Sequence, residues 1–246
     1  MTEFSGLAAL VTGGCSGIGA ATAALLRDRG AQVAVLDVRT EGAPAGVTAL
    51  RCDITDTPAV DTAVTQVAER FGGLDVLVNN AGIGAVGAID SNDETQWTRV
   101  LDVNVTGIAR ITTAALPHLR RSSHAAVVNL CSAVAFVGVR QRALYSASKG
   151  AVHALTLAMA ADHAAEGIRV NAVAPGTADT PWVSRLLDGA ENPEAAAEAL
   201  RARQPLGRLV TAEEVAHAIA SLASPLAGAT TGTILRVDGG MTSVRL

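Results

Sequence analysis

The chain has 246 residues, of which 49% are hydrophobic and 17% charged, with a formal net charge of −4 and a pI of about 5.7. This composition excludes a disordered chain and argues against a nucleic-acid partner, which normally leaves a basic footprint. The sequence shows no secretory signal and no run of 18 apolar residues, and its three cysteines and five histidines lack metal-ligand spacing. We therefore expect a cytoplasmic protein with no membrane partner and no metal site.

Short β-branched segments alternate with longer helical patterns along the whole chain. This alternation predicts an α/β protein with a doubly wound parallel sheet and helices on both faces. No repeat or linker divides the chain, so we expect one seven-stranded Rossmann-type domain over residues 1–246. Strands are predicted at 7–12, 31–38, 47–53, 74–82, 125–132, 168–176 and 233–237, and helices at 17–29, from the capping Asp56 onward, at about 94–118, and around Tyr145 to about 167.

A glycine cluster, TGGCSGIG, lies between the first predicted strand and the first predicted helix. Gly13, Gly17 and Gly19 would let the backbone turn tightly and approach a pyrophosphate at the helix N-terminus. Asp37, at the end of the second strand, is placed to accept a ribose 2′-hydroxyl and to repel a 2′-phosphate. These features favour NAD as the cofactor, although Arg39 lies beside the carboxylate and a glycine cluster can also mark only a tight turn.

The single tyrosine of the chain, Tyr145, is followed four residues later by the single lysine, Lys149. Residues at this spacing share one face of a helix. A nearby ammonium would lower the phenol pKa from about 10 toward the working range of an acid–base catalyst. The alternative is a core tyrosine beside a lysine whose ammonium reaches solvent, but the glycine cluster and the hydroxyl of Ser132 favour a catalytic role.

Several motifs occur in the order typical of one family. They are TGGCSGIG, NNAG at 79–82, YSASK at 145–149, NAVAPG at 171–176 and VDGG at 237–240. Ser132 stands 13 residues before Tyr145, and Asn104 stands 28 residues before Ser132. Over essentially its whole length the chain resembles the compact, NAD(P)-dependent short-chain dehydrogenase/reductase family.

The resemblance implies four catalytic residues. Tyr145 would be the general acid for carbonyl reduction and the general base for alcohol oxidation, and Lys149 would lower its pKa and hold the nicotinamide ribose. Ser132 would hydrogen-bond the substrate oxygen, and Asn104 would hold a water that links Lys149 to solvent. Cys131 adjoins Ser132 but should point the other way, into packing, because side chains alternate along a strand.

The same resemblance implies a set of cofactor contacts. The adenine would meet Asp53 and Ile54, and Thr180 would meet the carboxamide. Cys15 and Ala178 differ from the residues usual in the family, but contacts there are expected through the backbone. With Asp37, Tyr145 and Lys149, the implied cofactor-binding residues are Gly13, Cys15, Ser16, Gly17, Ile18, Gly19, Asp53, Ile54, Asn80, Ala81, Gly82, Pro175, Gly176, Ala178 and Thr180.

The segment after the sixth strand is similar to one branch of the family, which includes the cytosolic 3-hydroxybutyrate dehydrogenases and 2-keto-3-deoxy-sugar-acid dehydrogenases. Arg142 precedes Tyr145 by three residues, and an arginine can bind a carboxylate through two hydrogen bonds. We expect a small hydroxy acid whose carboxylate is held by Arg142 and Arg203, although both can equally be solvated surface charges. Trp182 would belong to a flap over the substrate, at about 180–208, or pack against another subunit.

Two other functions are considered. A 3-oxoacyl carrier-protein reductase shares the expected fold and catalytic residues, but Asp37 and the acidic net charge count against it. A non-catalytic, dinucleotide-sensing regulator belongs to another class, and the retention of Tyr145 and Lys149 disfavours it. The family is usually tetrameric or dimeric, and a mean hydropathy of +0.33 agrees with a homotetramer.

Overall fold

Seven parallel strands form the central sheet of the computed structural model, which describes residues 2–189 and 192–245. Their order is β3-β2-β1-β4-β5-β6-β9, as the sequence pattern predicts for a doubly wound sheet. Every pair within this sheet is parallel. The strands are β1 (Ala8–Thr12), β2 (Gln32–Asp37), β3 (Thr48–Arg51), β4 (Val76–Asn79), β5 (Ala126–Leu130), β6 (Arg169–Pro175) and β9 (Ile234–Val237).

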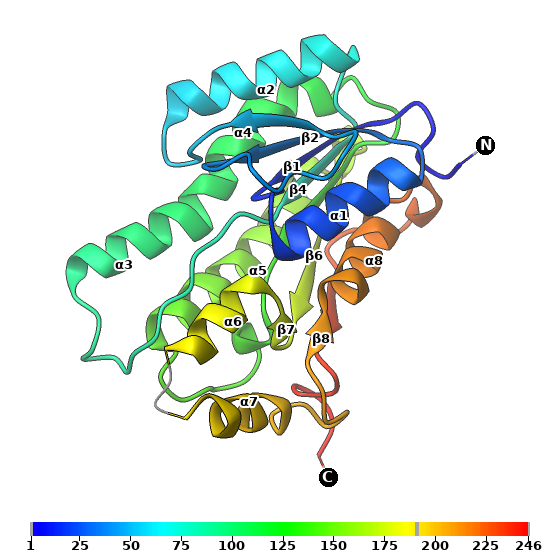
Figure 1. Ribbon diagram of the computed structural model, residues 1–246. Helices are drawn as coiled ribbons and strands as arrows, with labels where there is room; N and C mark the ends of the chain where they lie inside the picture. Colours follow the sequence, from blue (N-terminus) through cyan, green and yellow to red (C-terminus); the bar gives the residue numbers. More distant parts are fainter. Residues whose placement is uncertain (1, 190–191, 246) are drawn as a thin grey trace.

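Helices cover both faces of the sheet (Figure 1). One face packs against α1 and α8, and the other against α2, α4 and α5, so each face has its own apolar core. Burial on both faces explains the near-continuous apolar character of β1, β4 and β5. The helices are α1 (Gly17–Asp28), α2 (Thr57–Phe71), α3 (Glu94–Leu101), α4 (Gly107–Leu119), α5 (Ala143–His163), α6 (Pro181–Asp188), α7 (Pro193–Arg201) and α8 (Ala212–Ala223).

Local signals set the ends of several helices. The Asp56 carboxylate accepts a hydrogen bond from the Ala59 N–H at 3.1 Å, and α2 ends at Gly72 in the left-handed conformation. The helix that carries Tyr145 continues through a 3₁₀ turn to Gly167, which is also left-handed. The predicted cap of α2 and the predicted end of this helix are therefore confirmed.

The long helical region predicted at about 94–118 is confirmed, since α3, a π-helical turn and α4 run without interruption from Glu94 to Leu119. The π-helical turn, Asp102–Thr106, was not predicted. Buried Asn104 lies in this turn, and its side chain bonds groups outside its own helix. The helix therefore widens where a tertiary contact fixes a side chain, which a periodic apolar pattern does not indicate.

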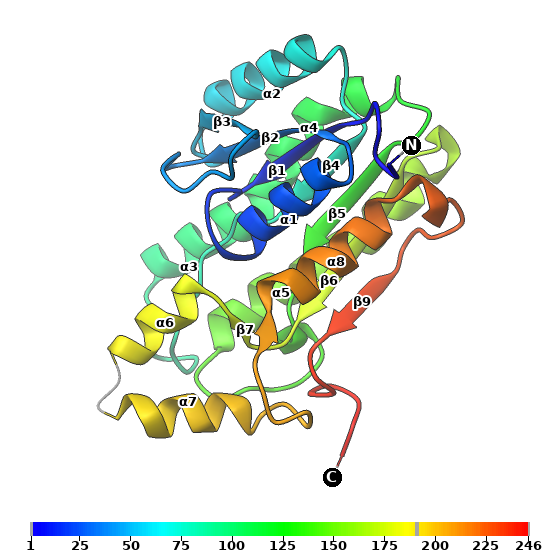
Figure 2. The same cartoon turned by 45° about the vertical axis from the view of Figure 1, so that its right-hand side comes forward.

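Two short strands, β7 (Ala178–Asp179) and β8 (Val210–Thr211), pair in parallel outside the main sheet and were not predicted. Figure 2 shows α6 and α7 together at the end of the molecule where the C-terminus lies. Residues 190 and 191 of the predicted flap lie outside the described part of the chain. Within that part, no helix combines the length and the apolar character that a membrane span requires.

Candidate active site

The glycine cluster forms a tight turn between β1 and α1. Gly13 and Gly17 have φ values of 63° and 50°, which side chains disfavour. A Cβ on Gly19 would lie 2.1 Å from the Gly13 carbonyl oxygen, so the start of α1 packs directly on the turn. The Asn80 amide donates to the carbonyls of Thr12 and Gly13 at 2.9 and 3.0 Å, and this fixes the turn against the end of β4.

Asp37 lies at the carboxyl end of β2, beside this turn. Its carboxylate accepts hydrogen bonds from the backbone N–H groups of Cys15 at 3.1 Å and Arg39 at 3.2 Å. The Cys15 side chain is buried, and burial, followed by the charges of Asp37 and Glu41, raises the pKa of its thiol. Cys15 therefore orients the Asp37 carboxylate through its backbone, while its thiol stays protonated.

A large cleft, of about 970 Å³, runs along the carboxyl ends of the strands from Asp37 to Lys149. Cys15 and Gly19 do not line it and instead support the turn from behind. Pro175, Gly176 and Ala178 line an adjoining pocket. The other predicted cofactor contacts meet in the cleft: Gly13, Ser16, Gly17, Ile18, Asp37, Asp53, Ile54, Asn80, Ala81, Gly82, Tyr145, Lys149 and Thr180.

The Asp53 carboxylate, which lines this cleft, is stabilised in its ionised form. Its carboxylate accepts hydrogen bonds from the backbone N–H and the hydroxyl of Thr55, at 2.9 and 2.8 Å. These two bonds, more than the charges of Arg110 and Arg99, lower the pKa of Asp53.

The adjoining pocket, of about 140 Å³, contains Ser132 and Tyr145. Tyr145 and Thr180 line both the pocket and the cleft, so the two spaces meet at these side chains. Ser132 follows the end of β5 and caps a 3₁₀ turn, and Tyr145 lies in the first turn of α5. Strand and helix thus bring the predicted catalytic hydroxyls to one place.

Asn104 connects α5, the helix that carries Tyr145, to the loop after β4. Its amide donates to the Ile83 carbonyl at 2.9 Å and to the Ser148 hydroxyl at 3.1 Å, while its carbonyl oxygen accepts from the Ile83 N–H at 2.8 Å. Ser148 in turn donates to the Tyr145 carbonyl at 2.8 Å. Both amide hydrogens of Asn104 are therefore engaged within the protein.

The electrostatics of Tyr145 differ from the sequence-based expectation. Burial raises its pKa to about 12, opposed by the Ser132 hydroxyl and then by the charge of Arg142. The ammonium of Lys149 donates to the Leu130 carbonyl at 2.7 Å and lies 5.8 Å from the centre of the phenol ring, and its charge does not outweigh the burial of Tyr145. Burial lowers the pKa of Lys149 itself to about 8.

Cys131 packs under this site, as strand alternation predicts. Its side chain is buried in the apolar core, and its thiol donates to the Lys149 carbonyl at 3.3 Å. Burial is the largest influence on this thiol and raises its pKa. Cys131 therefore packs against α5 from the end of β5.

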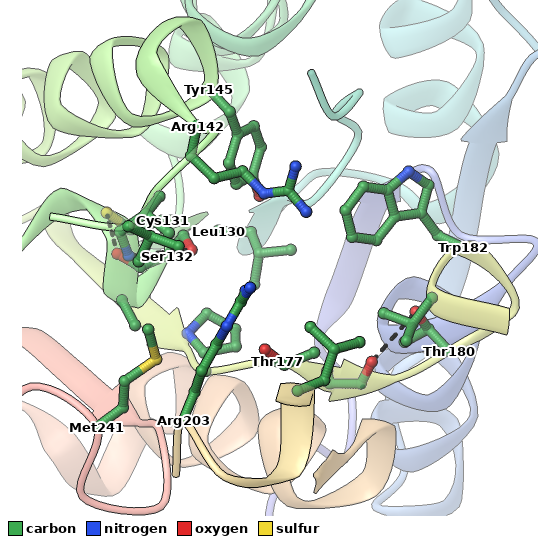
Figure 3. Close-up of a pocket in the computed structure, with 18 of the residues that line it drawn as sticks. Leu130, Cys131, Ser132, Arg142, Tyr145, Thr177, Thr180, Trp182, Arg203 and Met241 are labelled. Atoms are coloured by element: carbon green, nitrogen blue, oxygen red, sulfur yellow. Dashed lines mark hydrogen bonds between the residues drawn. The ribbon is translucent and has the colours of Figure 1, made fainter. Parts of the chain in front are cut away.

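Two arginines enter the pocket from different segments (Figure 3). Arg142 immediately precedes α5, and Arg203 follows α7. Burial and then the charge of Arg203 lower the pKa of Arg142, which places the two like charges near each other. Among the described residues neither guanidinium forms an ion pair with a carboxylate. The described side chains therefore leave positive charge unbalanced in the pocket, beside the hydroxyls of Ser132 and Tyr145.

Trp182, the second residue of α6, lines both the pocket and the cleft. A Cβ on Gly84 would lie 2.4 Å from the indole, so the ring rests on the backbone of the loop after β4. The indole remains 40% exposed. It therefore forms the outer wall where the two spaces join.

The aliphatic walls of the pocket were not predicted from the sequence. These side chains come from separate segments, and no local motif marks an isolated aliphatic residue as a pocket wall. They include Val139, Val183, Leu200 and Met241.

Comparisons with known proteins agree with this geometry. The family described as Enoyl-(Acyl carrier protein) reductase matches residues 13–242. Cis-4-hydroxycyclohexanecarboxylate dehydrogenase of Sinomonas cyclohexanicum is 46% identical over 252 residues, covering 98% of each chain. The 3-oxoacyl-(acyl-carrier-protein) reductase of Thermotoga maritima is 36% identical, covering 97% of this chain and 99% of its own.

Among solved structures, ligand-free aldohexose dehydrogenase of Thermoplasma acidophilum superimposes with a TM-score of 0.93 at 33% identity. The match covers 100% of this chain and 98% of that one. The three relatives are named for different substrates, so similarity alone does not select a substrate for this chain.

Proposed function

Because the chain belongs to the short-chain dehydrogenase/reductase family, whose members bind NAD or NADP, we propose that it is an NAD-dependent dehydrogenase of a small hydroxy acid. The reaction would interconvert a secondary alcohol and a ketone. The observation that carries the proposal is the pair of unbalanced guanidinium groups beside Ser132 and Tyr145.

The residues of the cleft fit a dinucleotide. Gly14 and Gly19 leave no room for a Cβ, and α1 begins within the glycine cluster at Gly17, which is the arrangement that receives a pyrophosphate. Asp37 and Lys149 both line this cleft. Asp37 would accept hydrogen bonds from the adenosine ribose, and Lys149 would hold the nicotinamide ribose. When bound, the nicotinamide would donate or accept the hydride.

The residues of the pocket would handle the proton. With a pKa of about 12, Tyr145 is protonated at neutral pH and can donate to the oxygen of a ketone. Ser132 would hydrogen-bond the same oxygen, and Asn104 would hold α5 and the loop after β4 in register. In the alcohol direction Tyr145 would take the proton, which requires its pKa to fall when the site is filled.

Replacing Tyr145 with Phe tests this chemistry, because it removes one hydroxyl and leaves the ring. We expect kcat to fall at least about 1,000-fold while NAD binding is retained. Stopped assays of NADH formation and calorimetry with NAD measure the two quantities. Turnover near that of the parent protein would contradict the assignment.

The preference for NAD is assigned to the Asp37 carboxylate, which would repel a 2′-phosphate. Asp37→Asn keeps the shape and removes the charge. We expect the ratio of KM for NADP to KM for NAD to fall by about tenfold or more. An unchanged ratio would show that another residue sets the preference, and exposed Arg39 in the same cleft would be the next candidate.

The hydroxy-acid substrate is supported by the arginine pair and by the name of the Sinomonas cyclohexanicum relative, which combines a hydroxyl with a carboxylate. The test compares a hydroxy acid with its methyl ester. Arg142→Ala should lower kcat/KM for the acid by about 30- to 100-fold and leave the ester unchanged. Arg208→Ala is a matched control, since Arg208 pairs with Glu214 outside the pocket.

A carrier-protein reductase remains the second candidate, since a relative of that name is 36% identical. It is disfavoured by Asp37 and by the net charge of −4, because an acidic carrier docks on a basic surface. Efficient NADPH-dependent reduction of a carrier-bound substrate would favour it. Tight NAD binding with no turnover of any alcohol or ketone would instead favour a dinucleotide sensor.

We also propose that residues 180–208 close over the substrate and that the protein is a homotetramer or homodimer. Trp182 at the junction of the two spaces supports the first proposal. Exposed Leu157 on α5 and Leu235 on β9 support the second. Light scattering measures the assembly directly, and a monomer would contradict it.

A further inference from the structure

Aliphatic side chains form much of the lining of the pocket that holds Ser132, Tyr145 and the arginine pair. They include Val139, Val183, Leu200 and Met241, from four different segments of the chain. Val183 on α6 and Leu200 on α7 are buried, so these two walls are held by helices and not only by loops. A ligand that spans the pocket must therefore place its central part against hydrocarbon.

The polar side chains of the pocket are few, and most have assigned partners. Ser132 and Tyr145 would face the reacting oxygen, and Arg142 and Arg203 would face the anion. Thr180 lies at the junction with the cleft. Among the side chains that the structure describes, Thr177 is then the remaining hydroxyl for any further polar group of a ligand.

Met241 is held in place by a carboxylate that has no other role in the site. Asp238 is buried, and it accepts hydrogen bonds from Gly240 N–H at 2.9 Å, Thr242 N–H at 3.0 Å and the Thr242 hydroxyl at 2.5 Å. The carbonyl of Gly239 also accepts from the Leu206 N–H at 3.1 Å. The C-terminal turn is thus tied to the segment after α7, which carries Arg203.

The size of the pocket limits the central part of the ligand. An apolar cavity of about 150 Å³ holds a benzene-sized molecule. The pocket here is of about 140 Å³, so its volume matches one six-membered ring or an acyclic body of similar size.

From these observations we infer that the substrate is a hydrocarbon hydroxy acid and not a polyhydroxylated sugar acid. Its body would be about the size of a six-membered ring and would carry one secondary alcohol, one carboxylate and no other polar substituent. The inference rests on the proposed function and narrows it. Beyond one hydroxyl that Thr177 could meet, each additional hydroxyl of a sugar acid would lose water and face a methyl or methylene group. Met241 is accordingly assigned as a specificity-determining residue.

Four compounds test the inference separately from the proposed function. They are 4-hydroxycyclohexanecarboxylate, gluconate, cyclohexanol and sorbitol, each assayed with NAD for kcat/KM. The contrast between hydrocarbon and polyhydroxylated compounds tests the pocket walls, and the contrast between acids and neutral alcohols tests the arginine pair. Calorimetry of the same four compounds with the NAD-loaded protein gives both contrasts if turnover is absent.

We expect 4-hydroxycyclohexanecarboxylate to exceed gluconate by at least about 100-fold, and cyclohexanol to exceed sorbitol in the same direction. Equal or greater efficiency with the polyhydroxylated partner in both pairs would overturn the inference. If kcat/KM is higher for both hydrocarbon compounds but no higher for the hydroxy acid than for cyclohexanol, the inference about the pocket walls is supported. The proposal that the arginine pair binds a carboxylate is then wrong.

A substitution in the wall sharpens the test. Met241→Gln keeps the length of the side chain and adds an amide, so the preference for the hydrocarbon acid over gluconate should fall by about tenfold. Val244→Gln is the matched control, since Val244 is exposed on the same C-terminal segment. An unchanged preference in Met241→Gln, or an equal change in the control, would remove Met241 from the assignment.

Discussion

The cleft that we propose for the cofactor and the pocket that we propose for the substrate, called here the cofactor end and the substrate end, are built in different ways. At the cofactor end, the turn between β1 and α1 acts through backbone groups, and its critical residues are glycines with no side chain. At the substrate end, the contacts come from side chains on α5, α6, α7 and the C-terminal turn. The cofactor end depends on glycines that lack a side chain, and the substrate end depends on the identity of the side chains that line the pocket.

This difference explains why one end can be read from a sequence more easily than the other. A turn of fixed shape requires particular residues at fixed spacing, so it leaves a motif. Side chains that meet from distant segments can be exchanged one by one, and each exchange changes the ligand without changing the fold. The glycine turn therefore indicates the family, whereas the substrate depends on the side chains of the pocket walls.

The largest effect on ligand binding is expected from a substitution in the glycine turn of the cofactor end. In Gly19→Ala, the new Cβ would lie 2.1 Å from the backbone oxygen of Gly13, which cannot move without deforming the turn. We expect NAD binding to weaken about 100-fold. Calorimetry with NAD measures this change.

The same substitution elsewhere gives the control. Gly150 lies within α5, and a Cβ there meets nothing within 4 Å. Gly150→Ala should raise the free energy of unfolding by about 0.5–1 kcal/mol, because alanine favours the helix, and leave NAD binding unchanged. If both variants lost affinity equally, the steric explanation for Gly19 would be wrong.

The second effect concerns Lys149, where the two ends meet. Burial lowers its pKa to about 8, so between pH 8 and its unfolded pKa the unfolded chain holds a proton that the folded chain does not. Stability therefore rises with pH through this window, and the full cost of burying the ammonium is present below about pH 8. Tyr145, with a pKa raised to about 12, acts in the opposite direction only above about pH 10.

Lys149→Met removes the charge and keeps the length of the side chain. We expect the free energy of unfolding of the parent protein, relative to the variant, to increase by about 2 kcal/mol from pH 7 to pH 10. Urea titrations of the ligand-free proteins at several pH values measure this difference. A parallel pH dependence of the two proteins would exclude a lowered pKa.

The smallest effect concerns the substrate end. Gln141 is the one non-glycine residue with a left-handed backbone in the described part of the chain, with φ at 59°. Its carbonyl accepts from the Gly87 N–H at 3.0 Å and from the Arg142 guanidinium at 3.2 Å. The backbone at residue 141 thus orients Arg142, while its own side chain is exposed.

Gln141→Gly should therefore stabilise the protein by up to about 1 kcal/mol, or raise Tm by about 2–4 °C, without changing KM for the hydroxy acid. Gln141→Val should lower Tm instead, since a β-branched residue disfavours this conformation. Thermal unfolding with a parallel KM measurement checks both variants. A lower Tm in the glycine variant would show that the Gln141 side chain contributes more than its backbone.

The strand and helix pattern was largely predictable because the core is buried on both faces of the sheet. The seven strands, the cap at Asp56 and the end of the catalytic helix at Gly167 follow from local residue types. The π-helical turn at Asn104 and the β7–β8 pair do not. Both arise from contacts between segments far apart in the sequence, which leave no periodic signal.

What the sequence determined by itself is the cofactor turn and the Tyr145–Lys149 pair, because each depends on a short, fixed spacing along one segment. Only the tertiary structure brought Arg142 and Arg203 together and enclosed them with aliphatic walls. It also decided the direction of the Tyr145 pKa, since burial outweighs the charge that lies one helical turn away. Spacing sets which side chains can meet locally, and packing sets their surroundings and therefore their chemistry.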